Sequence, residues 1–282
     1  MDIAVLLATF NRKEKTITCL ERLSAQLLPA GVKLNVFLTD DNSSDGTREA
    51  IAAQYPEVNV FKGSGSLFWA GGMRNSWTMA LDSDPDYFLL LNDDTVLRDD
   101  CIARLLKYYT LPTAGIADIT IGSTIDVLTK QVSYGGHKLY NKNSVTHYSV
   151  SSETEYVECD LANANIMMVP RETVKRIGIL SSAFTHSIAD FDYTLRAGAA
   201  GMKVIVVPGI LGECTDDNLV AARQKPPGFQ QRLKHLRSPK GLAYKEYMGF
   251  IKTHFPKHVP VVFAKIWTKT LFPSLWQKLK KQ

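Results

Sequence analysis

The 282-residue sequence has little cysteine and no long apolar run. Its four cysteines, Cys19, Cys101, Cys159 and Cys214, are widely spaced and form no CxxC pair, which argues against a zinc site and a disulfide framework. A reducing cytoplasm is the simplest location for such a chain. No segment reaches the roughly 18 apolar residues of a membrane-spanning helix. The N-terminus has no basic region before its apolar residues, so we expect no signal peptide and contact with a membrane from one side only.

The composition is that of an ordinary globular protein, with 45% hydrophobic and 22% charged residues. At this length one large α/β domain or two small ones can bury a substantial core. The net charge of +5 is unevenly distributed, because residues 223–282 carry fourteen Lys and Arg against one acid, Glu246. That segment has a net charge of +13, which leaves −8 for residues 1–222. We therefore expect an acidic body, residues 1–222, and a basic extension, residues 223–282, that would favour an anionic surface.

Apolar runs and helical spacing alternate along the first half of the chain. The expected strands are 3–8, 34–38, 58–61 and 87–91, and the expected helices are 13–26, 45–55, 71–81 and 99–109. This alternation predicts an α/β fold, a parallel sheet with helices on both faces. In such folds the ligand binds at the carboxyl ends of the strands.

The second half is less regular. We expect a β-hairpin near 131–140, strands at 165–169 and 203–207, and helices at 171–178 and 191–199. The last strand should end before Pro208 and Gly209, because proline and glycine commonly interrupt strands. From Pro226 the chain is basic, aromatic and interrupted by prolines, which indicates an appended helical element.

Acidic residues gather where expected strands end or a helix begins. The clusters are Asp40 and Asp41 with Asp45, Asn92 with Asp93 and Asp94, and Asp190 with Asp192. Carboxylates converging on a ligand crevice repel one another unless a cation or hydrogen-bond donors compensate. A divalent cation that bridges a diphosphate explains them economically, since hard cations bind carboxylate and phosphate oxygens. Each cluster alone also suits a helix N-cap or a turn, and for Asp45 that reading is favoured.

Six short segments follow one another in this order along the chain: Ala8-Thr9-Phe10-Asn11-Arg12, residues 39–47, Gly71-Gly72-Met73-Arg74-Asn75, Leu91-Asn92-Asp93-Asp94-Thr95, Gly178-Ile179-Leu180 and residues 189–197. Together they resemble the successive motifs of family 2 glycosyltransferases, which are inverting, metal-dependent enzymes of the GT-A fold. The resemblance covers about residues 1–215 and is specific through the order and spacing of its motifs. The variant is similar to bacterial rhamnosyl- and galactofuranosyltransferases of surface polysaccharide assembly.

The resemblance implies a nucleotide site at the end of the first strand. It puts Thr9, Asn11 and Arg12 at the nucleotide and gives Asp40 the N–H of the base. A carboxylate there favours uracil or thymine, whose N3–H is a donor. Arg74 would approach the diphosphate, although a solvated arginine on a helix face is a serious alternative.

The family's DxD motif corresponds to Asn92 and Asp94 as its outer positions. Asp94 is then the expected ligand of a divalent cation, Mg²⁺ or Mn²⁺, and Asp93 a contact to the ribose or sugar. Trp69, in a loop rich in glycine and serine, is expected to line the sugar pocket. That loop lacks the lysine of GxxxxGK[ST] and the spacing of GxGxxG, so it is not a phosphate-binding loop of those kinds.

Asp190 corresponds to the family's general base. A sugar hydroxyl is a poor nucleophile, and in-line attack at C1 needs a carboxylate opposite the leaving diphosphate. The alternative is that Asp190 only caps the helix that follows. Asp192 is expected to support the site or the acceptor.

Two positions depart from the family pattern. Ala189 stands where a glutamate often precedes the base. The histidine that usually completes the metal shell after the last strand is missing, and Glu213, Cys214 or Asp216 would have to substitute, unless Asp94, phosphates and water suffice. His137, His147 and His186 show no ligand spacing and are interpreted as surface or core residues.

The C-terminal residues 261–281 interleave aromatic residues with lysines. Such a segment suits the headgroups of an anionic membrane leaflet. Alternatively, its aromatics pack on the body or on a second subunit while the lysines stay solvated. Nucleic-acid binding is not expected, because no recognised module accompanies the charge.

The sequence thus predicts a glycosyltransferase that uses a UDP- or dTDP-linked sugar, rhamnose or similar, and a divalent cation. The acceptor would be a glycan or lipid-linked glycan in O-antigen, capsule or related polysaccharide synthesis, and the enzyme would be cytoplasmic or peripheral on the inner membrane face. One alternative is a catalytically lapsed protein that binds nucleotide sugars or acts as a scaffold. Another is a nucleotidyltransferase, but residues 8–15 lack its glycine-rich basic loop.

Overall fold

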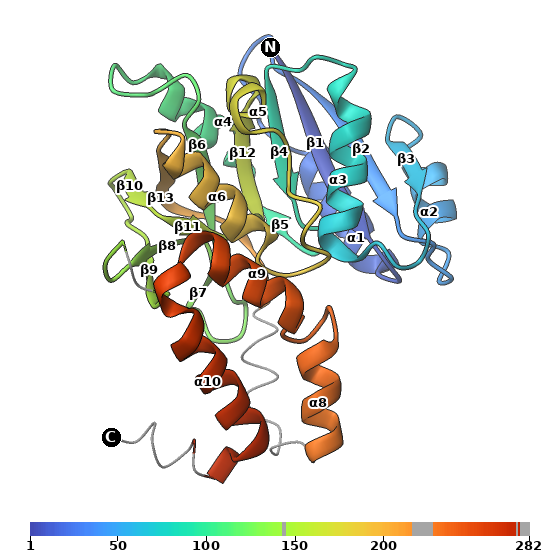
Figure 1. The fold of residues 1–282 in the computed structure, drawn as a ribbon. Helices are drawn as coiled ribbons and strands as arrows, with labels where there is room; N and C mark the ends of the chain where they lie inside the picture. The colour runs from blue at the N-terminus through green and yellow to red at the C-terminus, as the bar shows by residue number, and fades with distance from the viewer. Residues whose placement is uncertain (143–144, 216–227, 275, 277–282) are drawn as a thin grey trace.

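The computed structural model describes residues 1–142, 145–215, 228–274 and 276. Within them, the body of the protein is built on a ten-stranded mixed sheet with helices on both faces (Figure 1). The main path of the sheet runs in the order β10 (Val157–Cys159), β13 (Val204–Glu213), β6 (Ile119–Ile125), β12 (Ile166–Pro170), β4 (Tyr87–Leu91), β1 (Asp2–Thr9), β2 (Lys33–Asp40) and β3 (Asn59–Lys62). Two short strands join it off this path, β5 (Val96–Leu97) on β13 and β7 (Val132–Tyr134) on β6.

The four N-terminal strands of the main path are parallel, as their alternation with helices predicts. In their register Thr9, the last residue of β1, lies beside Asp40, the last residue of β2. Leu6 of β1 lies beside Leu90 of β4, so Asn92 follows β4 at the same edge of the sheet. The polar residues after β1, β2 and β4 are therefore gathered at one edge.

Alternate side chains of these strands enter two different cores. Ile3, Val5 and Leu7 of β1 face one core, which is closed by α1 (Lys13–Ser24), α2 (Thr47–Gln54) and α4 (Cys101–Lys107). Ala4 and Leu6 face the other core, which is closed by α3 (Phe68–Leu81), α5 (Arg171–Ile177) and α6 (Ala189–Ala199). A short 3₁₀ helix, Tyr108–Thr110, follows α4. The predicted α/β fold with helices on both faces is confirmed.

The second half of the sheet departs from the expectation in two places. The hairpin expected near 131–140 is wrong, because β7 pairs with β6 whereas the next strand, β8 (Gly136–Leu139), belongs to a separate sheet with β9 (His147–Val150) and β11 (Leu161–Ala162). Gly136 allows this crossing: a Cβ there would lie 2.2 Å from Cγ2 of Val206 in β13. The chain therefore passes too close to the main sheet for any side chain.

The strand expected at 203–207 also continues past Pro208 and Gly209, so the predicted end before these residues is wrong. The pairing of β13 with β6 shifts register between Val206 and Gly212, so proline sits at an irregularity of the strand. The guanidinium of Arg104 donates hydrogen bonds to the carbonyls of Pro208 and Ile210 there, which gives these groups the partners that a regular ladder would supply.

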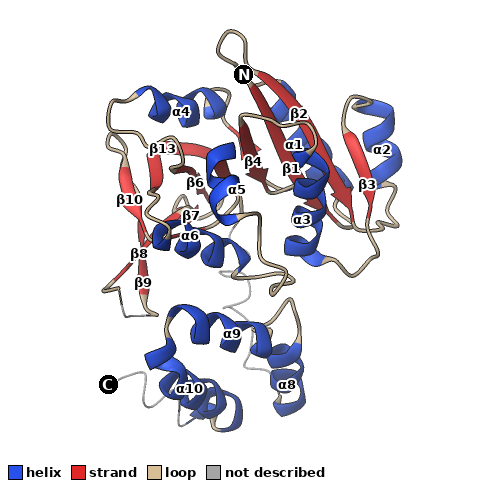
Figure 2. Ribbon diagram, turned by 45° about the horizontal axis from the view of Figure 1, so that its top comes forward, coloured by secondary structure: helices blue, strands red, loops and turns tan. Residues whose placement is uncertain are grey.

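The basic extension forms a helical group beside the body (Figure 2). It contains α8 (Phe229–Arg237), α9 (Tyr244–His254), a 3₁₀ turn (Pro256–His258) and α10 (Val259–Leu271). Phe250 and Ile251 of α9 are buried in the same core as Phe184 and α6. The expected boundary at 222/223 lies outside the described residues. No helix in the described part of the chain is both long and apolar enough to span a membrane.

Candidate active site

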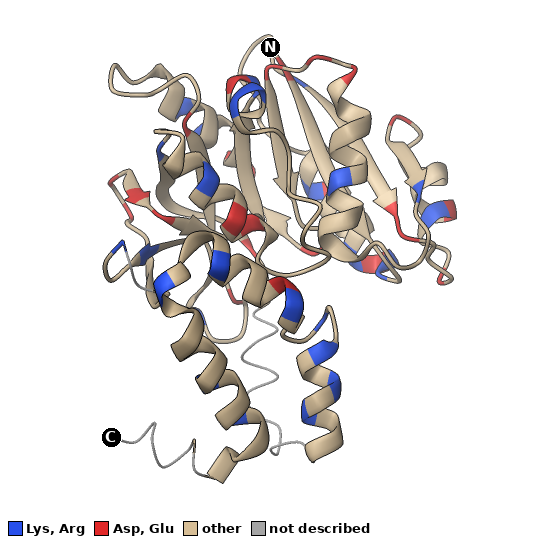
Figure 3. Ribbon diagram, viewed as in Figure 1, with Lys and Arg blue, Asp and Glu red and all other residues tan. Residues whose placement is uncertain are grey.

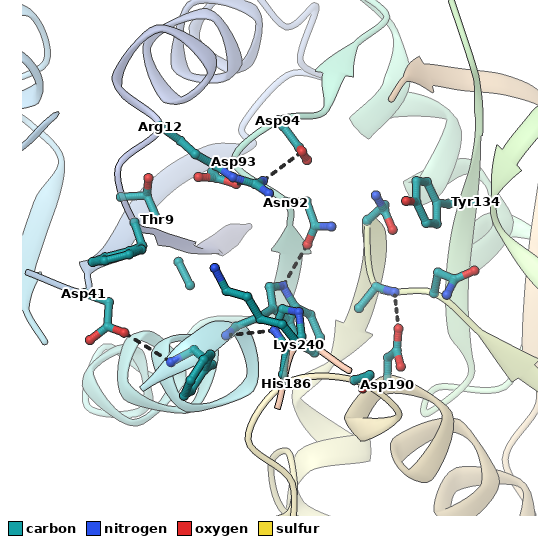
Figure 4. A pocket seen from close by; sticks show the side chains of 18 of the residues that line it. Thr9, Arg12, Asp41, Asn92, Asp93, Asp94, Tyr134, His186, Asp190 and Lys240 are labelled. Atoms are coloured by element: carbon teal, nitrogen blue, oxygen red, sulfur yellow. Dashed lines mark hydrogen bonds and ion pairs between the residues drawn. The ribbon is translucent and has the colours of Figure 1, made fainter. Parts of the chain in front are cut away.

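A cavity of about 440 Å³ opens at the carboxyl ends of β1 and β4 (Figure 4). The loops after these strands form one wall, and the N-terminal ends of α3 and α6 form others. The predicted site residues that line the cavity are Thr9, Arg12, Trp69, Asn92, Asp93, Asp94 and Asp190. The topology thus brings together side chains that lie up to 181 positions apart, between Thr9 and Asp190.

Arg12 links the two carboxylates that follow β4. Its Nη1 atom lies 3.1 Å from Oδ1 of Asp93 and 2.8 Å from Oδ2 of Asp94. Asp93 is only 4% exposed, and burial raises the pKa of its carboxyl to about 6, although the charge of Arg12 acts to lower it. Lys15 adds a longer contact of 3.5 Å to Asp94. This corner of the cavity therefore holds concentrated negative charge that is partly neutralised by cations.

The same corner fits a hard divalent cation in its donor chemistry. Asp94 and Asp93 supply carboxylate oxygens, and the described residues contain no group of three His, Cys, Asp or Glu side chains able to enclose a metal. Mg²⁺ commonly binds one or two carboxylates and completes its shell with substrate phosphates and water. The two neighbouring carboxylates of this corner, Asp93 and Asp94, suit that kind of shared site.

Cys214 occupies the region after β13 where the family histidine was expected. Its Sγ–H points to Oδ1 of Asp94 at 3.6 Å, and Asn165 donates to the same sulfur at 3.4 Å. Burial raises the pKa of the thiol to about 12, with the charge of Asp94 acting in the same direction. Cys214 thus orients Asp94. Glu213 is a strand residue paired with Val96 and is not among the lining residues of the described chain, and Asp216 lies outside the described residues.

The predicted nucleotide end is shaped by a loop tied to the start of α1. Asn11, with a positive φ of 52°, donates its backbone N–H to Ser43 Oγ (2.8 Å), and its Oδ1 accepts from the N–H of Ser44 (2.7 Å). Asp40 is 2% exposed and accepts from the N–H of Ser43. The contact of Asn11 and Asp40 with a nucleotide stays a prediction, since these side chains are seen to organise the loop.

Asp41, rather than Asp40, lines the cavity. Its carboxylate accepts three backbone hydrogen bonds from the loop that leads into α3, from Gly65 (2.7 Å), Leu67 (2.8 Å) and Phe68 (3.1 Å). A Cβ on Gly63 would lie 2.5 Å from Oδ1 of Asp41, so only glycine fits there. The glycine-rich loop is therefore wrapped around a carboxylate of the protein itself.

Trp69 and Asn92 join two walls of the cavity. Nε1 of Trp69 donates to Oδ1 of Asn92 at 2.8 Å, and the backbone N–H of Trp69 approaches Nδ1 of His186 at 3.4 Å. His186 lines the cavity, although its spacing in the sequence indicated no role. Burial lowers the pKa of His186, and the nearby charges of Lys240 and Arg12 lower it further. Its imidazole is therefore neutral near pH 7.

Arg74 has a different environment from the one that the motif implies. Its Nη1 donates to the carbonyls of Ser181 (2.8 Å) and Phe184 (2.7 Å), and it is not among the lining residues. It thereby anchors the segment that precedes α6. A role for Arg74 at the diphosphate stays a prediction.

Asp190 lies at the start of α6, across the cavity from Asp93 and Asp94 (Figure 4). Its carboxylate accepts from the backbone N–H of Phe191 (2.9 Å) and of Ala164 (3.3 Å) and from the side chain of Asn163. Burial nevertheless raises its pKa to about 6. A carboxylate with this pKa is mostly ionised at pH 7 and is a far better proton acceptor than an ordinary aspartate.

A series of hydrogen bonds orients Asn163, the side chain that bonds to Asp190. Oδ1 of Asn163 lies 2.9 Å from Nε2 of His137, whose Nδ1 lies 3.3 Å from Ser149 Oγ. Burial lowers the pKa of His137, which keeps the imidazole neutral. If Nε2–H donates to Oδ1 of Asn163, the amide NH₂ of Asn163 faces Asp190, which is the orientation that an ionised base needs.

Asp192 is directed away from the cavity and towards the extension. Its oxygens lie 2.8 Å from Nε of Arg196 and 2.8 Å from Nε2 of His254 in α9. Burial acts to raise its pKa, but the bonds from His254 and Arg196 prevail and hold it below its ordinary value. Glu246, the one acid of the extension, accepts from both the N–H and the hydroxyl of Thr185. These contacts fix the extension to the segment that carries His186 and Asp190.

Comparisons with known proteins give a family for this chain and solved structures of similar fold. The family model "Glycosyl transferase family 2" matches residues 4–163, and "Glycosyl transferase family group 2" matches residues 87–276. Among solved structures, a mannosyltransferase from Pyrobaculum calidifontis in complex with GDP-Man and Mn²⁺ matches with a TM-score of 0.57 at 15% identity, covering 98% of this chain and 72% of that one. Residues 1–349 of TarS from S. aureus in complex with UDP match with a TM-score of 0.56 at 15% identity, covering 91% and 72%. No curated protein sequence gives a significant match.

Proposed function

Since the chain belongs to glycosyl transferase family 2 and is a glycosyltransferase of the GT-A fold, we propose that it transfers a sugar from a UDP- or dTDP-linked donor to a hydroxyl acceptor with inversion. One observation carries the proposal. An acidic corner with a bridging arginine, Asp93, Asp94 and Arg12, faces a raised-pKa carboxylate, Asp190, across a single cavity. Opposed groups of this kind suit in-line displacement at C1 of a donor sugar.

The chemistry assigned to each group follows from its environment. Asp190 takes the proton of the acceptor hydroxyl as the new bond to C1 forms. Arg12 holds Asp93 and Asp94 in place and adds positive charge where the diphosphate leaves. A divalent cation, Mg²⁺ or Mn²⁺, held by Asp94 with help from Asp93, would neutralise the charge of the leaving diphosphate. Trp69 and Asn92 bound the space for the sugar.

The finer assignments concern the nucleotide base, the sugar and the acceptor. The ligands of the neighbours, GDP-Man and UDP, support a nucleoside diphosphate but differ in base. Asp40 at the end of β2 favours a base with an N–H donor, and the resemblance to rhamnosyl- and galactofuranosyltransferases favours rhamnose or a similar sugar. The acceptor would be a glycan or lipid-linked glycan of a surface polysaccharide.

The surface of α10 supports peripheral attachment of the protein to a membrane. Val261 and Leu271 of α10 and Phe272 just after it are exposed, and Lys265 and Lys269 also lie on α10. Apolar and basic groups together favour an anionic leaflet. Co-flotation with vesicles containing phosphatidylglycerol, but not with phosphatidylcholine vesicles, is expected for peripheral attachment. A dimer at this surface would instead appear in light scattering as a doubled mass without lipid.

A catalytically lapsed nucleotide-sugar binder is the second candidate, favoured by Ala189 and by the cysteine in place of the family histidine. Calorimetry with UDP and dTDP, with and without Mn²⁺, followed by a donor-hydrolysis assay, separates the two. An enzyme binds a nucleotide and turns over the matching sugar. A lapsed protein binds it without turnover.

A further inference from the structure

One side chain of the basic extension lines the active-site cavity. Lys240 lies in the turn between α8 and α9 and is a lining residue of the cavity. Its Nζ atom is 6.0 Å from the ring centroid of Phe10, the residue after Thr9 at the end of β1. In Figure 4 Lys240 is drawn over the cavity, with Thr9 and Asp41 on one side and Asp190 on the other.

The turn that carries Lys240 has a defined conformation. A Cβ on Gly241 would lie 1.9 Å from the carbonyl oxygen of His235, so only glycine allows the chain to close there. The N–H of Leu242 donates to that same carbonyl at 3.0 Å. The following helix is held on the body by Glu246 and His254. Lys240 is therefore presented by packed structure and not by a loose tail.

The charge of Lys240 is not compensated by the cavity's carboxylates. Among the described residues, no Asp or Glu oxygen lies within 4.0 Å of its ammonium, whereas the other strong cation of the lining, Arg12, is engaged by Asp93 and Asp94. His186 is neutral near pH 7 and does not compete for an anion. A protonated lysine facing a cavity in this way favours an anionic ligand.

We propose that Lys240 binds the β-phosphate of the donor's diphosphate and stabilises it as the leaving group, so that the C-terminal extension completes the active site. The inference rests on the proposed function and deepens it. A diphosphate is favoured over an acidic acceptor because Lys240 stands against Phe10, on the nucleotide side of the cavity. A lysine interacts with phosphate as a compact point charge, and the charge that develops on the leaving diphosphate is greatest at its β-phosphate.

The test compares nucleotide binding by full-length variants, measured by calorimetry. Lys240→Gln removes the charge and keeps most of the side chain, and Lys240→Arg keeps the charge. Lys245→Gln is the matched control, because Lys245 is an exposed lysine on α9 outside the cavity lining. The probes are UDP, dTDP and GDP, with UMP, dTMP and GMP as partners that lack the β-phosphate.

For the diphosphate that binds the wild type, we expect Lys240→Gln to weaken affinity about tenfold, in line with a partly solvated charge-assisted bond. The matching monophosphate should bind both proteins nearly equally. Lys240→Arg should restore most of the affinity, and Lys245→Gln should leave it unchanged. Turnover of the donor should fall at least as much as affinity in Lys240→Gln.

Three results would overturn the inference. Unchanged diphosphate binding in Lys240→Gln, with only the acceptor KM raised, would move Lys240 to the acceptor. Equal losses in Lys240→Gln and Lys245→Gln would show a general charge effect. If none of the three diphosphates binds the wild type, the proposed function fails together with this inference, whereas binding that ignores Lys240 refutes the inference alone.

Discussion

Replacing Asp190 by asparagine isolates the proton-accepting role from the shape of the site. Asparagine is nearly the same size and keeps one acceptor for the N–H groups of Phe191 and Ala164, but it cannot take a proton. General bases contribute about 10²- to 10⁴-fold, so kcat should fall by that factor. Donor affinity should stay close to that of the wild type, because Asp190 lies across the cavity from Asp93 and Asp94.

The stability of this variant follows from two opposing effects. Burial raises the pKa of Asp190 from 3.8 to about 6, which corresponds to about 3 kcal/mol. Because the folded-state pKa is raised, the folded protein keeps this stability of about 3 kcal/mol below about pH 4, where the carboxyl is protonated in both states. It loses this stability as the pH rises through about 6 and the buried carboxyl ionises. Asparagine carries no charge, so the variant does not lose this stability at neutral pH. Its NH₂ group, however, faces a backbone N–H, which costs about 1–3 kcal/mol. The two nearly cancel, so the melting temperature at pH 7.5 should change little.

The pH dependence gives an independent readout of the same group. With a pKa of about 6, the ionised fraction falls from about 90% at pH 7 to about 10% at pH 5, and kcat/KM of the wild type should fall about tenfold over that range. The residual activity of Asp190→Asn should fall less steeply over the same range, because of the two carboxyls with a pKa of about 6 only Asp93 still titrates there. A folded variant that retains more than about a tenth of wild-type kcat would refute the role of Asp190, since that loss is below the range for a general base.

Three further predictions concern the acidic corner, the extension and the cation. Arg12→Gln leaves Asp93 and Asp94 without their shared cation, so diphosphate affinity measured by calorimetry should fall tenfold or more, roughly 1.4 kcal/mol; an unchanged affinity would contradict this. His254→Ala removes one donor from buried Asp192 and should lower the free energy of unfolding by about 1–3 kcal/mol, seen as a lower melting temperature. Because His254 fixes the extension that carries Lys240, diphosphate binding should also weaken. A loss of stability alone would show that the extension does not set the donor site. EDTA should abolish turnover and Mn²⁺ restore it; activity that survives EDTA would exclude the cation.

The fold was largely predictable where local pattern and topology agree. The helices and the main-path strands up to residue 109 follow from apolar periodicity, because β1 and β4 are buried on both faces and each helix is buried on one. The insertion of antiparallel β12 between β4 and β6 was not predictable, since a buried run has the same pattern in either direction. The continuation of β13 through Pro208 depends on Arg104, a partner over a hundred residues away.

The site was predictable where it is built from strand ends. Thr9 ends β1, Arg12 lies shortly after it, and residues 92–94 follow β4 directly, so motif and position coincide. His186 and Lys240 were missed because they have no spacing relation to the motifs and reach the cavity only through tertiary packing. Asp192 was predicted only as a support of the site or the acceptor, and the sequence did not indicate its partners, Arg196 in the next turn of α6 and His254 in α9.

The structure shows where the unevenly distributed charges of the sequence lie. Basic residues lie along α8, α9 and α10, whereas acidic residues are scattered over the body together with further basic ones (Figure 3). The single acid of the extension, Glu246, is used for docking on Thr185, and one of its lysines, Lys240, enters the cavity. The extension is therefore tied to the catalytic body at the level of individual side chains.

The most direct test of the account is turnover of nucleotide sugars by the wild-type protein with Mn²⁺, followed by proton NMR of the anomeric signal of the released or transferred sugar. We predict that a UDP- or dTDP-linked sugar is consumed and that the first product has the anomeric configuration opposite to that of the donor. Retention of configuration, or tight binding of the donor without any turnover, would contradict the proposed function.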